Sequence, residues 1–459
     1  MRIRIQKKNN RRIFWMLFAL LIALIFVKYV LHVPFPREIF LGIVAVIALL
    51  GDRDENIAIC VCCIPLYSSM QYIYALVICM FFYVAKYHRD IKLGAGIILF
   101  LLMLLWEWFH CYDQISSLVG AVRAMTPLLF CTMLMYCRKD RINYPFVVRT
   151  LAICVSLMCL IVLSKLLVES RFNILRAFTN MQRLGMNAEE AEATGAEFNP
   201  NYLGFLCVIS VTGLLQLRLS SQKQKNDILI TVFLVVSGLL TMSRTYLLCL
   251  ALMIFLLMVS YGIKLKKFVK MLGAVAGIGL LVLAVLLLFF PETVENWVDR
   301  FSVQDITSGR LTLMELYHER IFSSPMIYMF GVGMQRVTPK IVRLFGSQKV
   351  LGTVVPHNAI QEMVFCWGFP GLILFCVFLW VMVTNARRKN PQIRLMNYVP
   401  LILLLIKIQA GQLLTTPSNM LILSVTYLSM CHVFQNKKTE RPLGGKVWKN
   451  RKGLSNESI

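Results

Sequence analysis

Charged residues are scarce in this sequence, because Asp, Glu, Lys and Arg together make up only 15% of its 459 residues. Hydrophobic residues make up 58%. They occur in uninterrupted runs of about twenty rather than at the spacing of amphipathic helices. Runs of that length are long enough to cross a bilayer as helices. The composition therefore predicts an all-α polytopic membrane protein.

Acidic residues are scarcer than basic ones, with 23 Asp and Glu against 48 Lys and Arg, and the formal net charge is +25. A charge of this size would indicate nucleic-acid binding if the basic residues gathered on one soluble face. They stand instead in short clusters between the apolar runs, which is the pattern of the positive-inside rule. We therefore expect no nucleic-acid partner.

Two further features of secreted proteins are missing. The first apolar run has no small-residue cleavage site, so we expect it to stay as the first membrane helix. The 14 cysteines include a C-x-C-C cluster at residues 60–63, but nearly all lie within apolar runs and only Cys111 falls clearly outside them. A disulfide framework needs partners in an oxidising compartment. We expect these cysteines to serve as small apolar residues.

The apolar runs predict roughly 12–14 membrane helices. Their ranges are about 13–33, 36–50, 57–67, 71–86, 93–110, 116–137, 146–168, 199–219, 227–242, 244–262, 268–290, 358–384, 397–413 and 417–435. Pro65 leaves open whether 57–86 is one long helix or two short ones. If the N-terminal RIRIQKKNNRR is cytoplasmic, most basic clusters and both termini fall on that same side.

This topology divides the chain into alternating membrane and outer segments. The expected order is N-terminal membrane helices (1–168), a first outer loop (169–198), central helices (199–290), a large extracytoplasmic loop (291–357), C-terminal helices (358–435) and a basic cytoplasmic tail (436–459). The large loop is too long to be a plain connector. We expect within it a helix over about 309–322, capped by Thr307 and Ser308, followed by a Gly331-x-Gly333 turn.

Several ionisable residues are expected at the outer side. His357 directly precedes a long span and follows the large loop, and Pro356 favours a helix start there. Arg244 lies in a short outer connection, and Arg123 lies inside a predicted span near its outer end. Lys407 adds a cation to the outer half of the 397–413 span, and Arg310 opens the loop helix. Charges placed within membrane spans usually line a cavity or meet an anion.

Four stretches together resemble the O-antigen ligase and polysaccharide polymerase (Wzy-type) family of bacterial membrane glycosyltransferases. They are Asn199-Pro200-Asn201-Tyr202 opening a helix, Ser243-Arg244-Thr245 at an outer turn, Ser308-Gly309-Arg310 followed by Gly331-x-Gly333, and His357-Asn358 followed by Gly368-x-x-Gly371. The resemblance covers about residues 195 to 375. It implies an enzyme that uses lipid-diphosphate-linked sugars at the outer face of the bacterial cytoplasmic membrane, with no required metal or other cofactor.

The resemblance also implies roles for the matched residues. His357 would be the general base that takes a proton from the acceptor hydroxyl, and Arg244 and Arg310 would bind the diphosphate. We add Arg123 as a further diphosphate ligand, and Asn201, Asn358 and Lys407 as supporting residues. The chain departs from the family pattern at two positions: Cys366 stands where an acidic residue is frequent, and Met314 where an aromatic one is.

Elementary chemistry agrees with these roles. A departing diphosphate gains negative charge, and fixed arginines bind phosphate oxygens through paired hydrogen bonds. A sugar hydroxyl needs a base, and the ordinary pKa of histidine, about 6.5, suits that task at neutral pH. The resemblance implies a polyprenyl-diphosphate-linked oligosaccharide, drawn from membrane lipid, as the substrate. A flippase and a chain-length regulator are the expected protein partners.

Three readings of function stay open at this point. A surface-polysaccharide polymerase, as for a capsule, is the first; a ligase that transfers the glycan to a different acceptor is the second, and the shared motifs barely separate them. A transporter or flippase is the third, but the chain shows no internal repeat. Asp52-Arg53-Asp54 resembles a metal-binding D-x-D, yet the topology puts it in a cytoplasmic turn, so we interpret it as ordinary loop charge.

Overall fold

The computed structural model confirms the all-α class. It describes residues 2–63, 66, 72–92, 94–111, 115–137, 142–174, 177, 183–185, 199–220, 222–262, 310–334, 358–409, 411, 413–414 and 417–434, with isolated positions between 266 and 298. Within these ranges the regular elements are helices, and an isolated bridge joins Ile91 to Cys137. The predicted span 268–290 falls largely outside the described residues.

The helices follow the predicted order closely. They are α1 (Arg2–Val30), α2 (Arg37–Leu50), α3 (Arg53–Cys62), α4 (Tyr72–Tyr87), the 3-10 helix η1 (His88–Asp90), α5 (Ala95–Cys111), α6 (Ile115–Tyr136), α7 (Tyr144–Glu169), α10 (Pro200–Leu219), α11 (Asp227–Leu240), α12 (Arg244–Tyr261), α15 (Arg310–Phe322), α16 (Pro325–Phe330), α18 (Ala359–Lys389), α19 (Leu395–Gln409) and α20 (Pro417–Cys431). Among the described residues, six helices are long and apolar enough to cross a membrane: α1, α6, α7, α10, α12 and α18.

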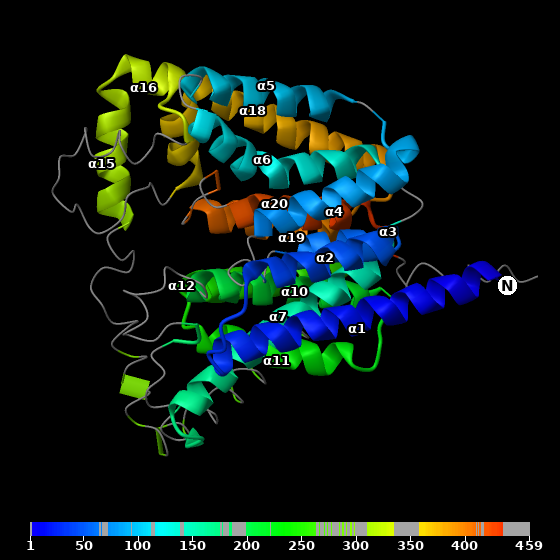
Figure 1. Cartoon of the computed structure of the whole chain (residues 1–459). Helices are drawn as coiled ribbons and strands as arrows, with labels where there is room; N and C mark the ends of the chain where they lie inside the picture. The colour runs from blue at the N-terminus through cyan, green and yellow to red at the C-terminus, as the bar shows by residue number, and fades with distance from the viewer. Residues whose placement is uncertain are drawn as a thin grey trace, which may run out of the picture.

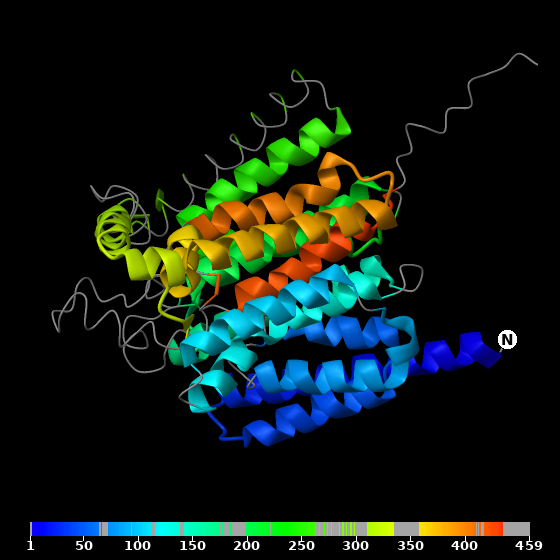
Figure 2. The same ribbon diagram turned by 90° about the horizontal axis from the view of Figure 1, so that it is seen from above.

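The membrane helices run side by side along one direction, and α15 lies across one end of them (Figure 1). Seen from above, α15 and α16 extend beyond the same end of the bundle, away from the N-terminus (Figure 2). We call the end that carries α15 and α16 the loop end. We call the opposite end, where α1 begins, the basic end.

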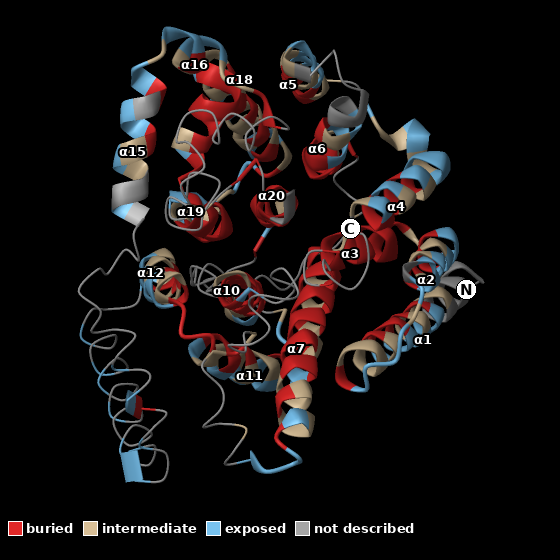
Figure 3. Cartoon of the chain, turned by 60° about the vertical axis from the view of Figure 1, so that its left-hand side comes forward, coloured by how far each residue is buried: buried red, intermediate tan, exposed pale blue. Residues whose placement is uncertain are grey.

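Side chains facing outward from the bundle are largely apolar. Met16, Phe81, Leu229 and Trp380 are each at least two-thirds exposed. By contrast, α10 and α20 lie inside the bundle and are buried over most of their length (Figure 3). Exposed apolar side chains spread over so many helices would favour aggregation in water. They suit a surface that faces lipid.

Basic residues far apart in the sequence meet at the basic end. Arg149 on α7 donates to both carboxylate oxygens of Asp227, at the start of α11, over 2.9 and 3.0 Å. Lys389, at the end of α18, donates to the carbonyl oxygens of Leu134 and Cys137, where α6 ends. The start of α7 and the basic end of α18 thus lie at the same end of the bundle, which agrees with the positive-inside pattern for Lys389.

The interpretation of Asp52-Arg53-Asp54 as ordinary loop charge is wrong. Asp52 precedes α3, and the side chains of Arg53 and Asp54 are buried within the bundle at the basic end. Arg53 pairs with Asp90, and the Asp54 carboxylate accepts from the backbone nitrogen of Asn143. Because α3 is shorter than a full span, its polar first turn lies inside the bundle, where charges must find partners.

The cysteines behave as small apolar residues. Of those whose side chains the structure describes, eleven are buried, and no disulfide joins any two of them. Cys159 on α7 and Cys207 on α10 lie with their sulfur atoms 3.9 Å apart, as a thiol contact between packed helices. Cys111, the one predicted outside the spans, is the last residue of α5, and its side chain is not among those described.

Candidate functional site

The loop end brings together the starts of α10, α12, α18 and α20 and the end of α19. The N-terminal half-turn of a helix carries a partial positive charge from its aligned peptide dipoles. Several such ends directed at one region favour an anion there. Most of the predicted site residues belong to these helix ends.

Asn199 and Asn201 set the start of α10. The side-chain oxygen of Asn199 accepts from the backbone nitrogens of Asn201 and Tyr202, which caps the helix, and Pro200 occupies the first helical position. The side-chain oxygen of Asn201 accepts a hydrogen bond of 2.9 Å from Nη2 of Arg183. Arg183 lies in the segment between α7 and α10, so this residue is fastened to the start of α10.

Arg244 is the first residue of α12. The Ser243 hydroxyl accepts from the backbone nitrogen of Tyr246 and caps the helix. The preceding turn is shared with Arg183, whose Nε donates to the carbonyl oxygen of Thr241 over 3.0 Å. Arg183 therefore contacts the short turn that Arg244 directly follows. Arg244 is half-buried, which limits its reach from the bundle.

Lys407 lies in the last turn of α19 and is 9% exposed. Its ammonium nitrogen donates to the side-chain oxygen of Asn419 on α20 over 2.5 Å. The same nitrogen lies 5.8 Å from the ring centre of Tyr202 and 5.4 Å from that of Phe205, both on α10. Aromatic ring faces attract cations. Lys407 thus joins α10, α19 and α20 near their loop ends.

Asn358 caps α18 and connects it to α19. Its side-chain oxygen accepts from the backbone nitrogens of Ile360 and Gln361, and its Nδ2 donates to both oxygens of Gln409. The buried carboxylate of Glu362 accepts from the backbone nitrogens of Leu413 and Leu414. The segment between α19 and α20 is therefore fixed against the first turn of α18.

Gln361 connects α18 to the loop helix. Its Nε2 donates to the carbonyl oxygen of Met314 on α15 over 2.8 Å. Tyr317 and Ile321 face the bundle from α15 and are buried, whereas Leu311 and His318 are exposed. The helix that begins with Arg310 is thereby held against the helix that follows His357.

The two glycine motifs interlock. Gly331, Gly333 and Gly368 all have positive φ, at 81°, 83° and 67°. The backbone nitrogen of Gly333 donates to the carbonyl oxygen of Cys366 over 2.7 Å. A side chain on Gly331 would overlap the Cys366 carbonyl, and one on Gly368 would lie 2.6 Å from the backbone of Met329. Glycine is required here for both conformation and space.

Three side chains of α5 hold this glycine contact. The Glu107 carboxylate is fully buried and accepts from the backbone nitrogen of Met334 and from Nε1 of Trp367. Trp106 Nε1 donates to the carbonyl oxygen of Trp367 over 2.8 Å. His110 Nε2 lies 2.7 Å from the carbonyl oxygen of Phe330. A helix from the N-terminal half thus positions the end of α16 and the bend of α18.

The remaining predicted residues lie elsewhere. His357 and the side chain of Arg310 fall outside the described residues, although their neighbours Asn358 and Leu311 are placed at the loop end. Arg123 is exposed on α6, with its guanidinium 5.1 Å from the ring centre of Tyr74 on α4. Helices α4 and α6 lie on the other side of the bundle from α12 (Figure 3). The structure does not bring Arg123 to Arg244.

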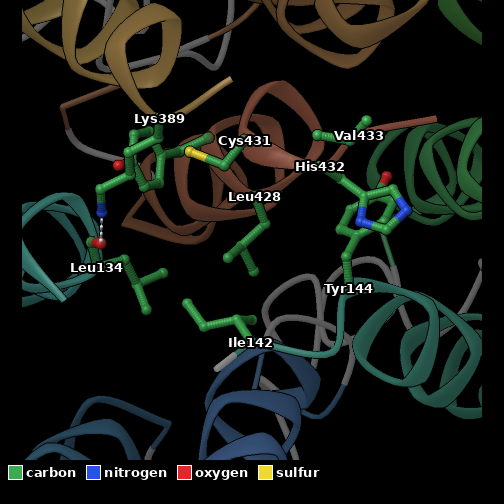
Figure 4. A pocket seen from close by; sticks show the side chains of 9 residues that line it. Leu134, Ile142, Tyr144, Lys389, Leu428, Cys431, His432 and Val433 are labelled. Atoms are coloured by element: carbon green, nitrogen blue, oxygen red, sulfur yellow. Dashed lines mark hydrogen bonds between the residues drawn. The ribbon is translucent and has the colours of Figure 1, made fainter. Parts of the chain in front are cut away.

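A cavity of about 260 Å³ lies at the basic end, not at the loop end. Tyr144, Lys389, Tyr427 and His432 line it together with apolar residues (Figure 4). The Lys389 ammonium that borders it donates to the carbonyl of Leu134. This cavity is separate from the residues described above.

Comparison with known families decides the identity of the central region. Residues 229–376 match the family profile Wzy_C, described as O-antigen ligase. This region of the chain is similar to the O-antigen ligase family. No curated protein sequence matches the chain. The resemblance drawn from the sequence is confirmed for the three stretches that lie within residues 229–376, whereas Asn199-Pro200-Asn201-Tyr202 lies before them. The apolar helices agree with a membrane protein.

The region that matches the O-antigen ligase family begins within α11 and ends within α18. It includes Arg244, Arg310 and His357. Several residues that contact its elements lie outside it, among them Glu107 on α5, Asn201 on α10 and Lys407 on α19. The loop end is thus built from the matched region together with helices on either side of it.

Sequence reasoning missed Arg183, Glu107 and Glu362. Glu107 is a carboxylate within an apolar run, and a charge there is itself a signal of function or of a buried partner. Glu362 lies four residues after the Asn358 cap, inside a span. Arg183 had no such signal, because it stands in a polar loop among other charged residues. Only its contacts with Asn201 and Thr241 single it out.

Proposed function

We propose that this protein is a surface-polysaccharide polymerase. It transfers a glycan from a polyprenyl-diphosphate carrier to a sugar hydroxyl of a second lipid-linked repeat unit. The observation that carries the proposal is the arrangement at the loop end, where Arg244, Arg183 and Lys407 accompany several helix N-termini beside the helix that follows His357.

The proposed reaction exchanges one bond for another at the anomeric carbon. His357 takes the proton of the acceptor hydroxyl while the hydroxyl oxygen bonds to the anomeric carbon. The bond from the carbon to the diphosphate oxygen breaks on the opposite face, so the configuration is inverted. The polyprenyl diphosphate leaves with the bonding electron pair, and Arg244 and Arg310 stabilise its growing charge. No metal takes part in this scheme.

The positions of the helix ends support a reaction at the boundary between membrane and water. The polyprenyl tail would remain among the lipids, while the diphosphate and sugars would sit at the water edge. Arginines at the first residues of α12 and α15 suit a diphosphate at that level, since an arginine at a boundary costs far less than one at mid-membrane. The positive-inside pattern favours a loop end that faces outward, with both termini in the cytoplasm.

The test uses purified protein in liposomes supplied with lipid-linked repeat units alone. Longer chains are expected from the parent protein, and none from His357→Ala. The matched control is His318→Ala, since His318 is exposed on α15 and has no role in the scheme. A fully active His357→Ala variant would overturn the mechanism.

The ligase alternative is favoured by the description of the family itself. It is separated by adding a second, non-lipid-linked acceptor to the same liposomes. If chains move only to that acceptor and never lengthen on the carrier, the protein is a ligase and the polymerase assignment is wrong.

A further inference from the structure

Arg123 lies on a lipid-facing part of the bundle. It is exposed on α6, and its neighbours Val119 and Val122 are also exposed, at 41% and 46%. From Ala124 to Phe130 the same helix is buried except for the half-buried Leu129. The exposed part of α6 is therefore confined to its first few turns, near the loop end.

The facing helix has a matching surface. Tyr74, Val77 and Phe81 follow one another along α4 at helical spacing, and their exposed fractions are 38%, 48% and 67%. Apolar side chains at this exposure mark the surface as one that lipid chains cover. The guanidinium of Arg123 lies over the ring of Tyr74, which fixes its position on this surface.

A guanidinium in such a place needs an anion or water. Arg123 stands eight residues after the start of α6, which corresponds to about 12 Å along the helix axis. Among the described side chains, no carboxylate forms an ion pair with it. Helix α6, which carries Arg123, lies on another side of the bundle from α12, which begins with Arg244 (Figure 3), so Arg123 is separate from the diphosphate site proposed above.

We infer that Arg123 and Tyr74 form a binding site for the phosphate group of a membrane lipid in the leaflet at the loop end. The planar guanidinium binds two phosphate oxygens through parallel hydrogen bonds. Tyr74 holds the guanidinium plane, and the exposed valines of α4 and α6 contact the lipid chains. A tyrosine near the lipid–water boundary is the usual position for that residue in membrane proteins.

The site is tested by counting lipids that stay bound to the detergent-purified protein in native mass spectrometry. Phosphatidylglycerol is the probe, and diacylglycerol, which lacks the phosphate, is the matched lipid control. Arg123→Gln should weaken retention of phosphatidylglycerol at least about tenfold, since hydrogen bonds to a charged group are lost. Retention of phosphatidylglycerol by Arg123→Lys should lie between that of Arg123→Gln and that of the parent protein, because lysine keeps the charge without the paired geometry.

Two further variants keep the result interpretable. Tyr74→Leu should also weaken retention, because the guanidinium loses its support. Arg171→Gln removes another exposed cation of the loop end and should leave retention unchanged. Because Arg123 is exposed, its variants should keep the unfolding temperature of the parent protein.

Three outcomes would overturn the inference. If Arg123→Gln retained phosphatidylglycerol as well as the parent protein does, Arg123 would contact water and not the lipid phosphate. If the parent protein retained diacylglycerol as well as phosphatidylglycerol, the acyl chains, not the phosphate, would be bound. Displacement of the lipid by millimolar inorganic phosphate would mean a site for free anions. Since none of these readouts uses glycan transfer, they are independent of the proposed function.

Discussion

Glu107 accepts a hydrogen bond of 2.7 Å from the indole nitrogen of Trp367, across 260 positions of sequence. The same carboxylate accepts from the backbone nitrogen of Met334. One side chain of α5 therefore joins the segment after α16 to the bend in α18. The carboxylate is fully buried, so its hydrogen bonds are made where water does not compete.

Replacing Glu107 by Gln should destabilise this contact. The amide has a single acceptor oxygen. Its NH₂ group would face the backbone nitrogen of Met334 or the indole nitrogen of Trp367, which are both donors. Loss of one hydrogen bond to a charged group costs about 1.5–3 kcal/mol. The unfolding temperature should fall, and hydrogen exchange of residues 332–334 should become faster.

The control for this prediction is Glu38→Gln. Glu38 is exposed in the first turn of α2, so neither quantity should change. Trp367→Phe tests the partner, because it removes the indole donor and keeps a ring. If Glu107→Gln and Trp367→Phe acted additively in the double variant, the two residues would not act through one contact.

Gly331→Ala should disrupt the contact between α16 and α18. The new methyl group would overlap the Cys366 carbonyl and lie 2.5 Å from the backbone nitrogen of Trp367, at a φ of +81°. Both the clash and the strained conformation are unfavourable. We expect lower yields of folded protein, measured by fluorescence-detected gel filtration. Gly42→Ala on α2, with open space around it, should be folded as well as the parent protein.

Arg244→Gln should lower glycan transfer about 10²- to 10³-fold, the usual cost of losing one preorganised charge contact. The unfolding temperature should stay close to that of the parent protein. Arg183→Gln should act in the same direction, and Arg244→Lys should recover part of the activity. Arg388→Gln, at the basic end, is the control. Unchanged transfer by Arg244→Gln would exclude a role for this residue with the diphosphate.

When Lys407 and Asn419 are changed together, stability should recover but glycan transfer should not. Asn419→Leu alone takes an acceptor from a buried ammonium group and should be strongly destabilising. Lys407→Met with Asn419→Leu replaces the buried polar contact by apolar groups and should restore much of the stability. Transfer should stay low in the double variant, because the cation is missing. Thermal unfolding and the liposome assay measure the two quantities separately. Recovery of transfer together with stability would limit Lys407 to a structural role.

Much of the fold follows from local sequence properties. Apolar runs long enough to cross a bilayer predicted helices such as α7, α10 and α18 within a few residues, because a membrane span must satisfy its own backbone hydrogen bonds. The helix starts at about residues 199, 244 and 358 were predicted from the ends of these runs. The caps at Asn199, Ser243 and Asn358 were identified in the structure, although each depends only on neighbours within one turn.

Contacts between segments far apart in the sequence could not be predicted in this way. The sequence alone determined the class of the protein, the order of its helices and the resemblance of its central region to the O-antigen ligase family. Only the tertiary structure decided that Arg183 contacts Asn201, that Glu107 holds the glycine contact, that Asp54 is buried, and that Arg123 faces away from Arg244. The physical reason is that helix formation depends on residues a few positions apart, whereas the surroundings of a charged side chain depend on which helices pack beside it.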